Sequence, residues 1–218
     1  MVALASPLPV ALPIALIGGF TYWRRGLVEL RIALWTALGG VPTVIAGSYL
    51  TAYIPGRVLM LITGVFVIVI GIRLLRGPLV SGPNGNAAYA SRSLLIGVGA
   101  TVGLLSGLLA NGGGFLLVPA YLLLFRMEPQ RCSATSLVAI AFLSVPGTWI
   151  HNRLGHVDFR LAELLAAGVI PATYAGARLA MHLNARHSRH LFGIFLLLFG
   201  TLFFLRTLHR IELYGWSI

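Results

Sequence analysis

The chain has 218 residues, of which 58% are hydrophobic and 10% are charged, a composition that excludes an ordinary soluble domain. The formal net charge of +11 does not indicate nucleic-acid binding, because the basic residues are spread over short loops between apolar runs. A single cysteine, Cys132, excludes an intrachain disulfide and a thiol-based metal cluster. We therefore predict an all-α, polytopic membrane protein with no cofactor and no metal site.

Apolar runs of the length that crosses a bilayer as a helix recur along the chain. In the first part we predict spans at about 8–23, 32–53 and 58–75. Residues 77–92 are dominated by Gly, Pro, Asn and Ser, which indicates a surface linker. We expect 1–76 to be a first repeat unit of about three spans, incomplete at its start.

The second unit is predicted to cover 93–208 and to contain about four spans. Its apolar segments lie at about 94–110, 115–125, 133–150, 161–183 and 191–208. Residues 209–218 read as an interfacial tail, because Tyr214 and Trp216 suit the headgroup region of a membrane.

One apolar segment, GLLSGLLANGGGFLLVP at 103–119, breaks the rules of helix formation at its centre. Asn and three successive Gly residues at 111–114 are poor helix formers. Irregular backbone is tolerated at membrane depth only where it faces protein or a water-filled cavity. The N–H groups at such a break can hold an anion. The alternative is a close contact between two helices through small residues.

We predict a substrate site around this break. The N–H groups of Gly112, Gly113 and Gly114 are suited to forming a nest for a small anion. Asn111 either donates its side-chain amide to the same anion or caps a helix. Ser106, on the same segment, is a further candidate for lining the cavity.

Four polar residues outside the break are also predicted to take part in substrate binding. The hydroxyls of Thr135 and Ser136 either face the cavity or bond back to their own helix. Arg178 is ionisable at membrane depth, which indicates a substrate or gating role, but it lies near enough to its span's end to reach the headgroups. His151 either relays a proton coupled to export or is a hydrogen-bonded residue at the membrane boundary.

The chain contains an internal repeat, which a shift of 129 residues reveals by placing Arg24 on Arg153. Glycines, prolines and loop charges match together, as in Gly26/Gly155, Glu29/Asp158, Gly39/Gly168, Pro42/Pro171 and Gly47/Gly176. Duplicated halves around a site at the midplane are typical of transporters.

The direction of the repeats depends on the glycine segment. If residues 93–126 cross the membrane once, corresponding spans point the same way; if the segment turns back, the repeats are inverted. The matching loop charges favour a single crossing and about seven spans.

The segments GLLSGLLANGGGFLLVPAYLLL, SATSLVAIAFLSVPGTWIHNRLGHVDF and AAGVIPATYAGARLA, in this order, resemble the sulfite exporter TauE/SafE family of membrane permeases. The resemblance covers about 94–208, and the first unit resembles the later part of that family's first repeat. Relative to the family the chain is short at its N-terminus, since the first copy of the glycine motif is absent. Asn111 also stands where the family more often has an apolar or small residue.

The resemblance implies export of sulfur-containing oxyanions, such as sulfite or organosulfonates, across a bacterial inner (cytoplasmic) membrane. We expect a secondary transporter whose partners are a small anionic substrate and the lipid bilayer, and not an enzyme or an ATPase, because the sequence has no P-loop. The alternatives are a non-transporting scaffold, a homo-oligomer in which two chains complete a path, and an intramembrane serine hydrolase using Ser106 and His151.

Overall fold

The computed structural model describes residues 7–54, 56–76, 90–109 and 114–214. These residues form helices and short turns with no strand among them, which confirms the predicted all-α class. The elements are α2 (Leu8–Trp23), α3 (Leu30–Leu50), the 3-10 helix η1 (Thr51–Tyr53), α4 (Gly56–Arg76), α5 (Arg92–Leu109), α6 (Gly114–Phe125), α7 (Pro129–Arg153), α8 (Phe159–His182) and α9 (Ala185–Tyr214).

Each predicted apolar segment corresponds to one helix. Within the described residues, five helices are long and apolar enough to cross a membrane: Leu30–Tyr53, Arg92–Leu109, Pro129–Arg153, Phe159–His182 and Arg186–Thr207. Leu8–Trp23 and Leu116–Phe125 are shorter apolar helices. The chain is therefore a polytopic helical membrane protein, as predicted.

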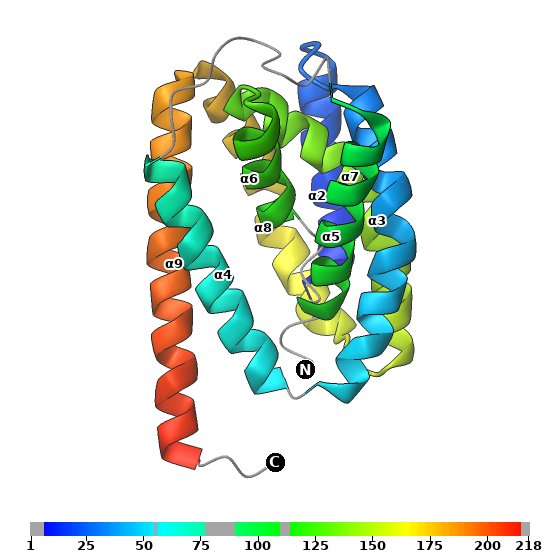
Figure 1. Cartoon of the computed structure of the whole chain (residues 1–218), viewed down its shortest axis with the longest axis vertical. Coiled ribbons are helices and arrows are strands. Elements are labelled where there is room, and N and C mark those ends of the chain that lie inside the picture. The colour runs from blue at the N-terminus through cyan, green and yellow to red at the C-terminus, as the bar shows by residue number, and fades with distance from the viewer. Residues whose placement is uncertain (1–6, 55, 77–89, 110–113, 215–218) are drawn as a thin grey trace.

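Interhelical contacts define two ends of the bundle. At the Glu29 end, where α3 and α7 begin, Arg131 Nη1 pairs with Glu29 Oε1 at 2.6 Å. At the His151 end, Nε2 of His151 lies 3.0 Å from the carbonyl oxygen of Gly107, which also accepts a hydrogen bond from Thr51. The Glu29 end is at the top of Figure 1 and the His151 end is at the bottom.

The glycine segment turns back on itself. The α5 helix begins at the Glu29 end, where the carbonyl of Ala90 accepts a hydrogen bond from Arg31, and reaches the His151 end at Gly107. The α7 helix starts again at the Glu29 end, so α6 must return the chain to that end, as Figure 1 shows. The preference for a single crossing of 93–126 is therefore wrong. The sequence of this twelve-residue helix does not show in which direction it crosses the membrane, and the loop charges predicted the wrong direction.

The repeat-related helices consequently run in opposite directions. The shift of 129 residues places α2 on α7, α3 on α8 and α4 on α9. The α2 helix ends at the Glu29 end and α7 ends at the His151 end, so the repeats are inverted. The division into units at 1–76 and 93–208 remains a prediction.

The two turns that end α2 and α7 have the same backbone. Gly26 and Gly155 adopt φ angles of 67° and 69°, a left-handed conformation in which glycine avoids the steric cost of a Cβ. The same hydrogen bond closes both turns, from Leu27 N to Tyr22 O at 3.3 Å and from His156 N to His151 O at 2.9 Å. The repeat is thus visible in the backbone as well as in the sequence.

The α3 and α5 helices pack with their backbones in close approach. A Cβ atom at Gly39 or Gly47 of α3, or at Gly99, Gly103 or Gly107 of α5, would overlap the backbone of the other helix. Small residues allow this approach where a membrane provides no hydrophobic force between helices. The alternative interpretation of the glycine segment, a close helix contact, therefore holds for its first part, Gly103 and Gly107.

Candidate functional site

The helix is interrupted at the glycine-rich segment. The α5 helix ends at Leu109 and α6 begins at Gly114. Asn111, Gly112 and Gly113 lie outside the described residues, and their roles in binding stay predictions. Gly114 is the first residue of α6, so the N–H groups at the start of α6, which have no partner within the helix, point toward the interruption.

The end of α5 is fixed by donors from two other helices. The last carbonyls of a helix have no intrahelical partner. Here the single hydroxyl proton of Thr51 is shared among three carbonyl oxygens, that of Gly47 at 3.0 Å and those of Gly107 and Leu108 at 3.3 and 3.2 Å, and His151 Nε2 lies 3.0 Å from that of Gly107. Because both side chains are buried, these contacts stabilise the point at which the helix stops.

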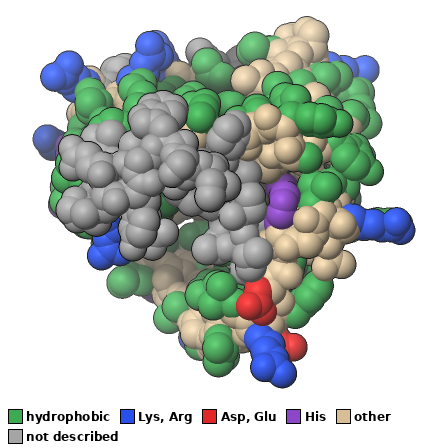
Figure 2. All heavy atoms as spheres, turned by 90° about the horizontal axis from the view of Figure 1, so that it is seen from below, with side chains coloured by type: hydrophobic (Ala, Val, Ile, Leu, Met, Phe, Trp, Pro, Cys, Tyr) green, Lys and Arg blue, Asp and Glu red, His purple; other side chains and the backbone are tan. Residues whose placement is uncertain are grey.

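His151 connects this helix end with a second histidine. Its side chain is fully buried, and its Nδ1 lies 3.3 Å from Nδ1 of His156. If Nε2 of His151 donates to Gly107, Nδ1 is the acceptor and His156 supplies the proton between the two rings. Burial lowers the pKa of His156, which lies in the turn after α7. Figure 2 views this end and shows a histidine at the surface, with the charged side chains at the rim.

Ser106 lies on α5 one residue before Gly107 and is buried. The structure therefore places it at the same end as His151. Both ring nitrogens of His151 have other partners, Gly107 and His156, and Ser106 is not among the partners found in the described residues. The geometry gives no support to a serine–histidine hydrolase.

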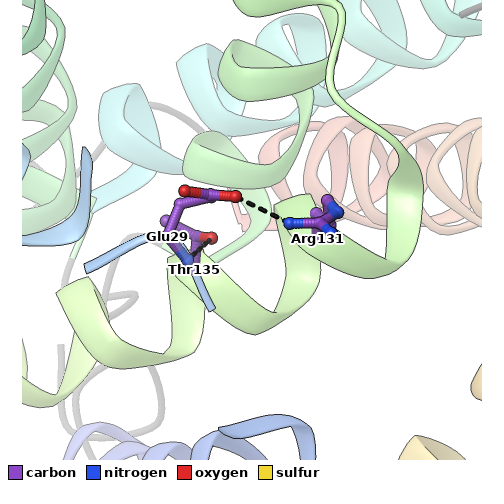
Figure 3. Close-up of polar contacts among 3 residues, drawn as sticks. All are labelled: Glu29, Arg131 and Thr135. Carbon is purple, nitrogen blue, oxygen red and sulfur yellow. Dashed lines mark hydrogen bonds and ion pairs between the residues drawn. The ribbon is translucent and has the colours of Figure 1, made fainter. Parts of the chain in front are cut away.

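Thr135 and Ser136 lie near the other end, on the first turns of α7. Thr135 Oγ1 accepts a hydrogen bond from the backbone N–H of Glu29 at 3.1 Å, beside the Glu29–Arg131 ion pair (Figure 3). This partner, on the turn between α2 and α3, was not predicted. Ser136 Oγ donates to the carbonyl of Ser133 at 3.0 Å, the bond back to its own helix that the sequence offered as one alternative.

Ser136 also borders a hollow between α2, α6, α7 and α8, which we call the inner hollow. Its volume is about 300 Å³, and it is lined by Gly18, Tyr22, Val118, Ser133, Ser136, Leu137, Ile140, Thr173, Gly176 and Ala177. Val118 lies four residues after Gly114, or about 6 Å along the axis of α6. The inner hollow therefore approaches the start of α6 and the interruption.

A second hollow of about 170 Å³ shares Tyr22, Val118 and Ser133 with the inner hollow and extends to Gln130 and Arg189 at the Glu29 end. We call it the entrance hollow. The two hollows adjoin each other at these three residues, and the inner hollow is open toward the outside of the helix bundle.

Sequence reasoning assigned no role to Arg189, although it borders the entrance hollow. Its side chain is only 8% exposed, which is rare for arginine in any protein. A signal was present, because Arg189 shares the helical spacing of Gly193, Leu196 and Gly200, all on the buried face of α9.

Arg178 lies away from the interruption. It is exposed near the end of α8, with its guanidinium carbon 4.5 Å from the ring centre of Tyr174. It borders a separate groove at the Glu29 end together with Arg24 and Arg25. The described site residues that the sequence predicted thus fall into four places: Ser106 and His151 at the His151 end, Gly114 at the start of α6, Thr135 and Ser136 on the first turns of α7, and Arg178 in the separate groove. Among the described residues, no group of three His, Cys, Asp or Glu side chains is placed to hold a metal ion.

Comparison with known proteins gives consistent matches. The family model described as "Sulfite exporter TauE/SafE" matches residues 1–203. The "Probable membrane transporter protein YunE" of Bacillus subtilis is 27% identical over 85% of this chain and 72% of its own length. A "Probable membrane transporter protein" of Xylella fastidiosa is 30% identical over 77% of this chain, but only 64% of the relative is covered, less than two thirds of its length. No solved structure gives a significant match.

Proposed function

The chain belongs to the sulfite exporter TauE/SafE family, and from this premise we propose that it is a secondary transporter that exports small sulfur-containing oxyanions such as sulfite or organosulfonates. The observation that carries the proposal is the interrupted helix. The α5 helix stops at Leu109, α6 returns from Gly114, and the inner hollow lies beside the first turns of α6.

In this proposal the anion binds at the start of α6, whose Val118 lines both hollows. Main-chain N–H groups at a helix start attract negative charge without a resident cation. Arg189 in the entrance hollow adds a positive potential along the way in, which raises the local concentration of anions. The inverted relation of the two halves supports alternating access, because rocking one repeat against the other exposes a midplane site to each side in turn.

The distribution of arginine supports an orientation. Eleven of the sixteen arginines lie at the Glu29 end with two acidic residues, which gives that end +9; the other five, with three acidic residues, give the His151 end +2. The eleven are Arg24, Arg25, Arg31, Arg73, Arg76, Arg92, Arg126, Arg131, Arg178, Arg186 and Arg189. We place the Glu29 end in the cytoplasm of a bacterial cell, since basic loops are retained there. A cytoplasm-negative potential then favours export of an anion.

Reconstituted vesicles test the proposal. Uptake or release of sulfite, thiosulfate, an organosulfonate and sulfate is measured with and without a pH gradient. We expect flux of at least one sulfur oxyanion, reduced about tenfold or more in Arg189→Gln, as loss of one charge-assisted contact predicts. Arg153→Gln serves as the control, because Arg153 lies at the opposite, His151 end of the bundle. We expect this variant to keep wild-type flux. Absence of flux for every anion would favour the non-transporting scaffold.

A homo-oligomer remains a proposal. It is consistent with α8, on which only Ala162 and Ala177 are buried, so that a second copy of the chain or lipid covers the rest of this helix. Disulfide crosslinking in native membranes tests it with Gly168→Cys, because the natural Cys132 is buried and contributes no background. A monomeric band alone would count against this assembly.

A further inference from the structure

A separate groove at the Glu29 end concentrates positive charge. Its volume is about 380 Å³, and it lies between the ends of α2 and α8. Three arginines line it, Arg24 and Arg25 just after the end of α2 and Arg178 on α8, with the rings of Phe20 and Tyr174. It shares no lining residue with the inner or entrance hollow.

Two of the guanidinium groups are held over aromatic rings. The Cζ atom of Arg24 lies 5.8 Å from the ring centre of Phe20, and that of Arg178 lies 4.5 Å from the ring centre of Tyr174. Contact with a ring face orients a guanidinium group and leaves N–H groups at its edge able to donate. Such a group is suited to the oxygens of a phosphate, which it can bind through two parallel hydrogen bonds.

The groove's positive charge has no carboxylate to balance it among the described residues. Within that part of the chain, the one ion pair found joins Arg131 to Glu29, and no acidic side chain lines the groove. Three neighbouring cations therefore repel one another, and an anionic ligand would relieve this repulsion.

The position of the groove relative to the membrane indicates which kind of anion fits. Arg24 directly follows the last residue of α2, and Arg178 lies about one turn before the end of α8, so the guanidinium groups lie where a hydrocarbon core gives way to headgroups. On the same helices, Phe20 and Leu179 are 65% and 64% exposed, which extends apolar surface beside the arginines. A soluble anion uses only the arginines, whereas a phospholipid uses both surfaces.

We infer that the groove formed by Arg24, Arg25 and Arg178 binds the phosphate of an anionic phospholipid in the leaflet at the Glu29 end. The acyl chains lie against the exposed apolar side chains of α2 and α8. This site is independent of the transport path, and it assigns to Arg178 a partner other than the transported substrate.

Native mass spectrometry tests the inference on the purified full chain, titrated with phosphatidylglycerol. We expect one tightly bound lipid on the wild type. Each arginine replaced in Arg24→Gln, Arg25→Gln and Arg178→Gln should weaken binding by about fivefold, as the attraction of one basic residue to an anionic leaflet predicts. Arg178→Lys keeps the charge and should lose less affinity than Arg178→Gln.

A matched control lies at the opposite end. Arg153 is the repeat equivalent of Arg24, and its Cζ atom lies 5.7 Å from the ring centre of Trp149, but it is not part of this groove. Arg153→Gln should leave the tightly bound lipid in place. An unchanged thermal unfolding midpoint in each variant shows that altered binding does not come from misfolding.

Three outcomes would overturn the inference. The first is wild-type affinity in the triple glutamine variant, and the second is binding of phosphatidylcholine as tight as that of phosphatidylglycerol. In the third, glycerol 3-phosphate or inorganic phosphate at equal concentration displaces the lipid, which would identify a site for soluble anions. Each outcome is read from lipid adducts alone and leaves the transport proposal to its own test.

Discussion

The turn between α2 and α3 and the turn between α7 and α8 are built from matching residues, but they are held in different ways. Both place a left-handed glycine after a helix and an acidic residue before the next one. At the first turn, Glu29 pairs with Arg131 of α7 and its backbone N–H bonds to Thr135. At the second, Asp158 accepts hydrogen bonds from the first N–H groups of its own helix. One motif thus links the two halves and the other caps a helix.

The glycines of the repeat-related helices differ in the same way. A Cβ at Gly39 of α3 would overlap the carbonyl of Ile96 on α5, whereas one at Gly168 of α8 would meet nothing within 4 Å. The two positions have the same place in the repeat, but only Gly39 faces a partner helix, because α8 packs against α2 through other residues, such as Thr173 beside Gly18. The effect of a repeated glycine on packing therefore depends on the helix next to it. The α5 helix, which lies against Gly39, has no counterpart in the other half of the repeat.

The glycine pair gives the largest expected effect. Gly39→Ala forces α3 and α5 apart and should lower the free energy of unfolding by about 2 kcal/mol or more, a cost typical of overpacking. Gly168→Ala adds a methyl group to open space and should leave the free energy of unfolding unchanged or raise it by up to about 1 kcal/mol, because alanine is the better helix former. The midpoint of thermal unfolding in detergent, followed by tryptophan fluorescence, measures both. Equal losses in the two variants would mean that α8 is covered as closely as α3.

The positions of the helices were predictable because an apolar run of bilayer length specifies a helix whatever surrounds it. The end of α5 at Leu109, just before the Asn-Gly-Gly-Gly segment, was predictable for a similar reason, since glycine and asparagine disfavour a helix locally. The direction of α6 was not predictable from the sequence. It depends on the packing that brings Arg131, at the start of α7, next to Glu29 at one end of the bundle. The partner of Thr135 and the burial of Arg189 also depend on packing between helices far apart in the sequence.

The acidic residues of the two turns should give intermediate effects of different kinds. Asp158→Ala removes an N-cap and should cost about 1 kcal/mol, without any dependence on Arg131 at the other end of the bundle. Glu29→Gln and Arg131→Gln should instead be coupled in a double-mutant cycle, by up to about 1 kcal/mol, because the ion pair is partly exposed to solvent. A coupling near zero would show that Thr135 and packing, not the ion pair, join the halves at this turn.

The smallest effect concerns the residue after the left-handed glycine, which is Leu27 in the first turn and His156 in the second. Burial lowers the pKa of His156 below its ordinary value of 6.5, so below pH 6.5 the unfolded chain binds a proton more readily than the folded chain. The contribution of His156 to stability is therefore present above pH 6.5 and declines as the pH falls through the folded pKa.

His156→Leu installs the residue of the first turn and should reduce the difference between unfolding midpoints at pH 7.5 and pH 5. The effect is small because the ring is only partly buried, and the other histidines and the acidic residues still titrate in both proteins. The comparison of wild type with the variant removes those shared contributions, so an identical pH dependence would mean that burial in this turn does not lower the pKa of His156.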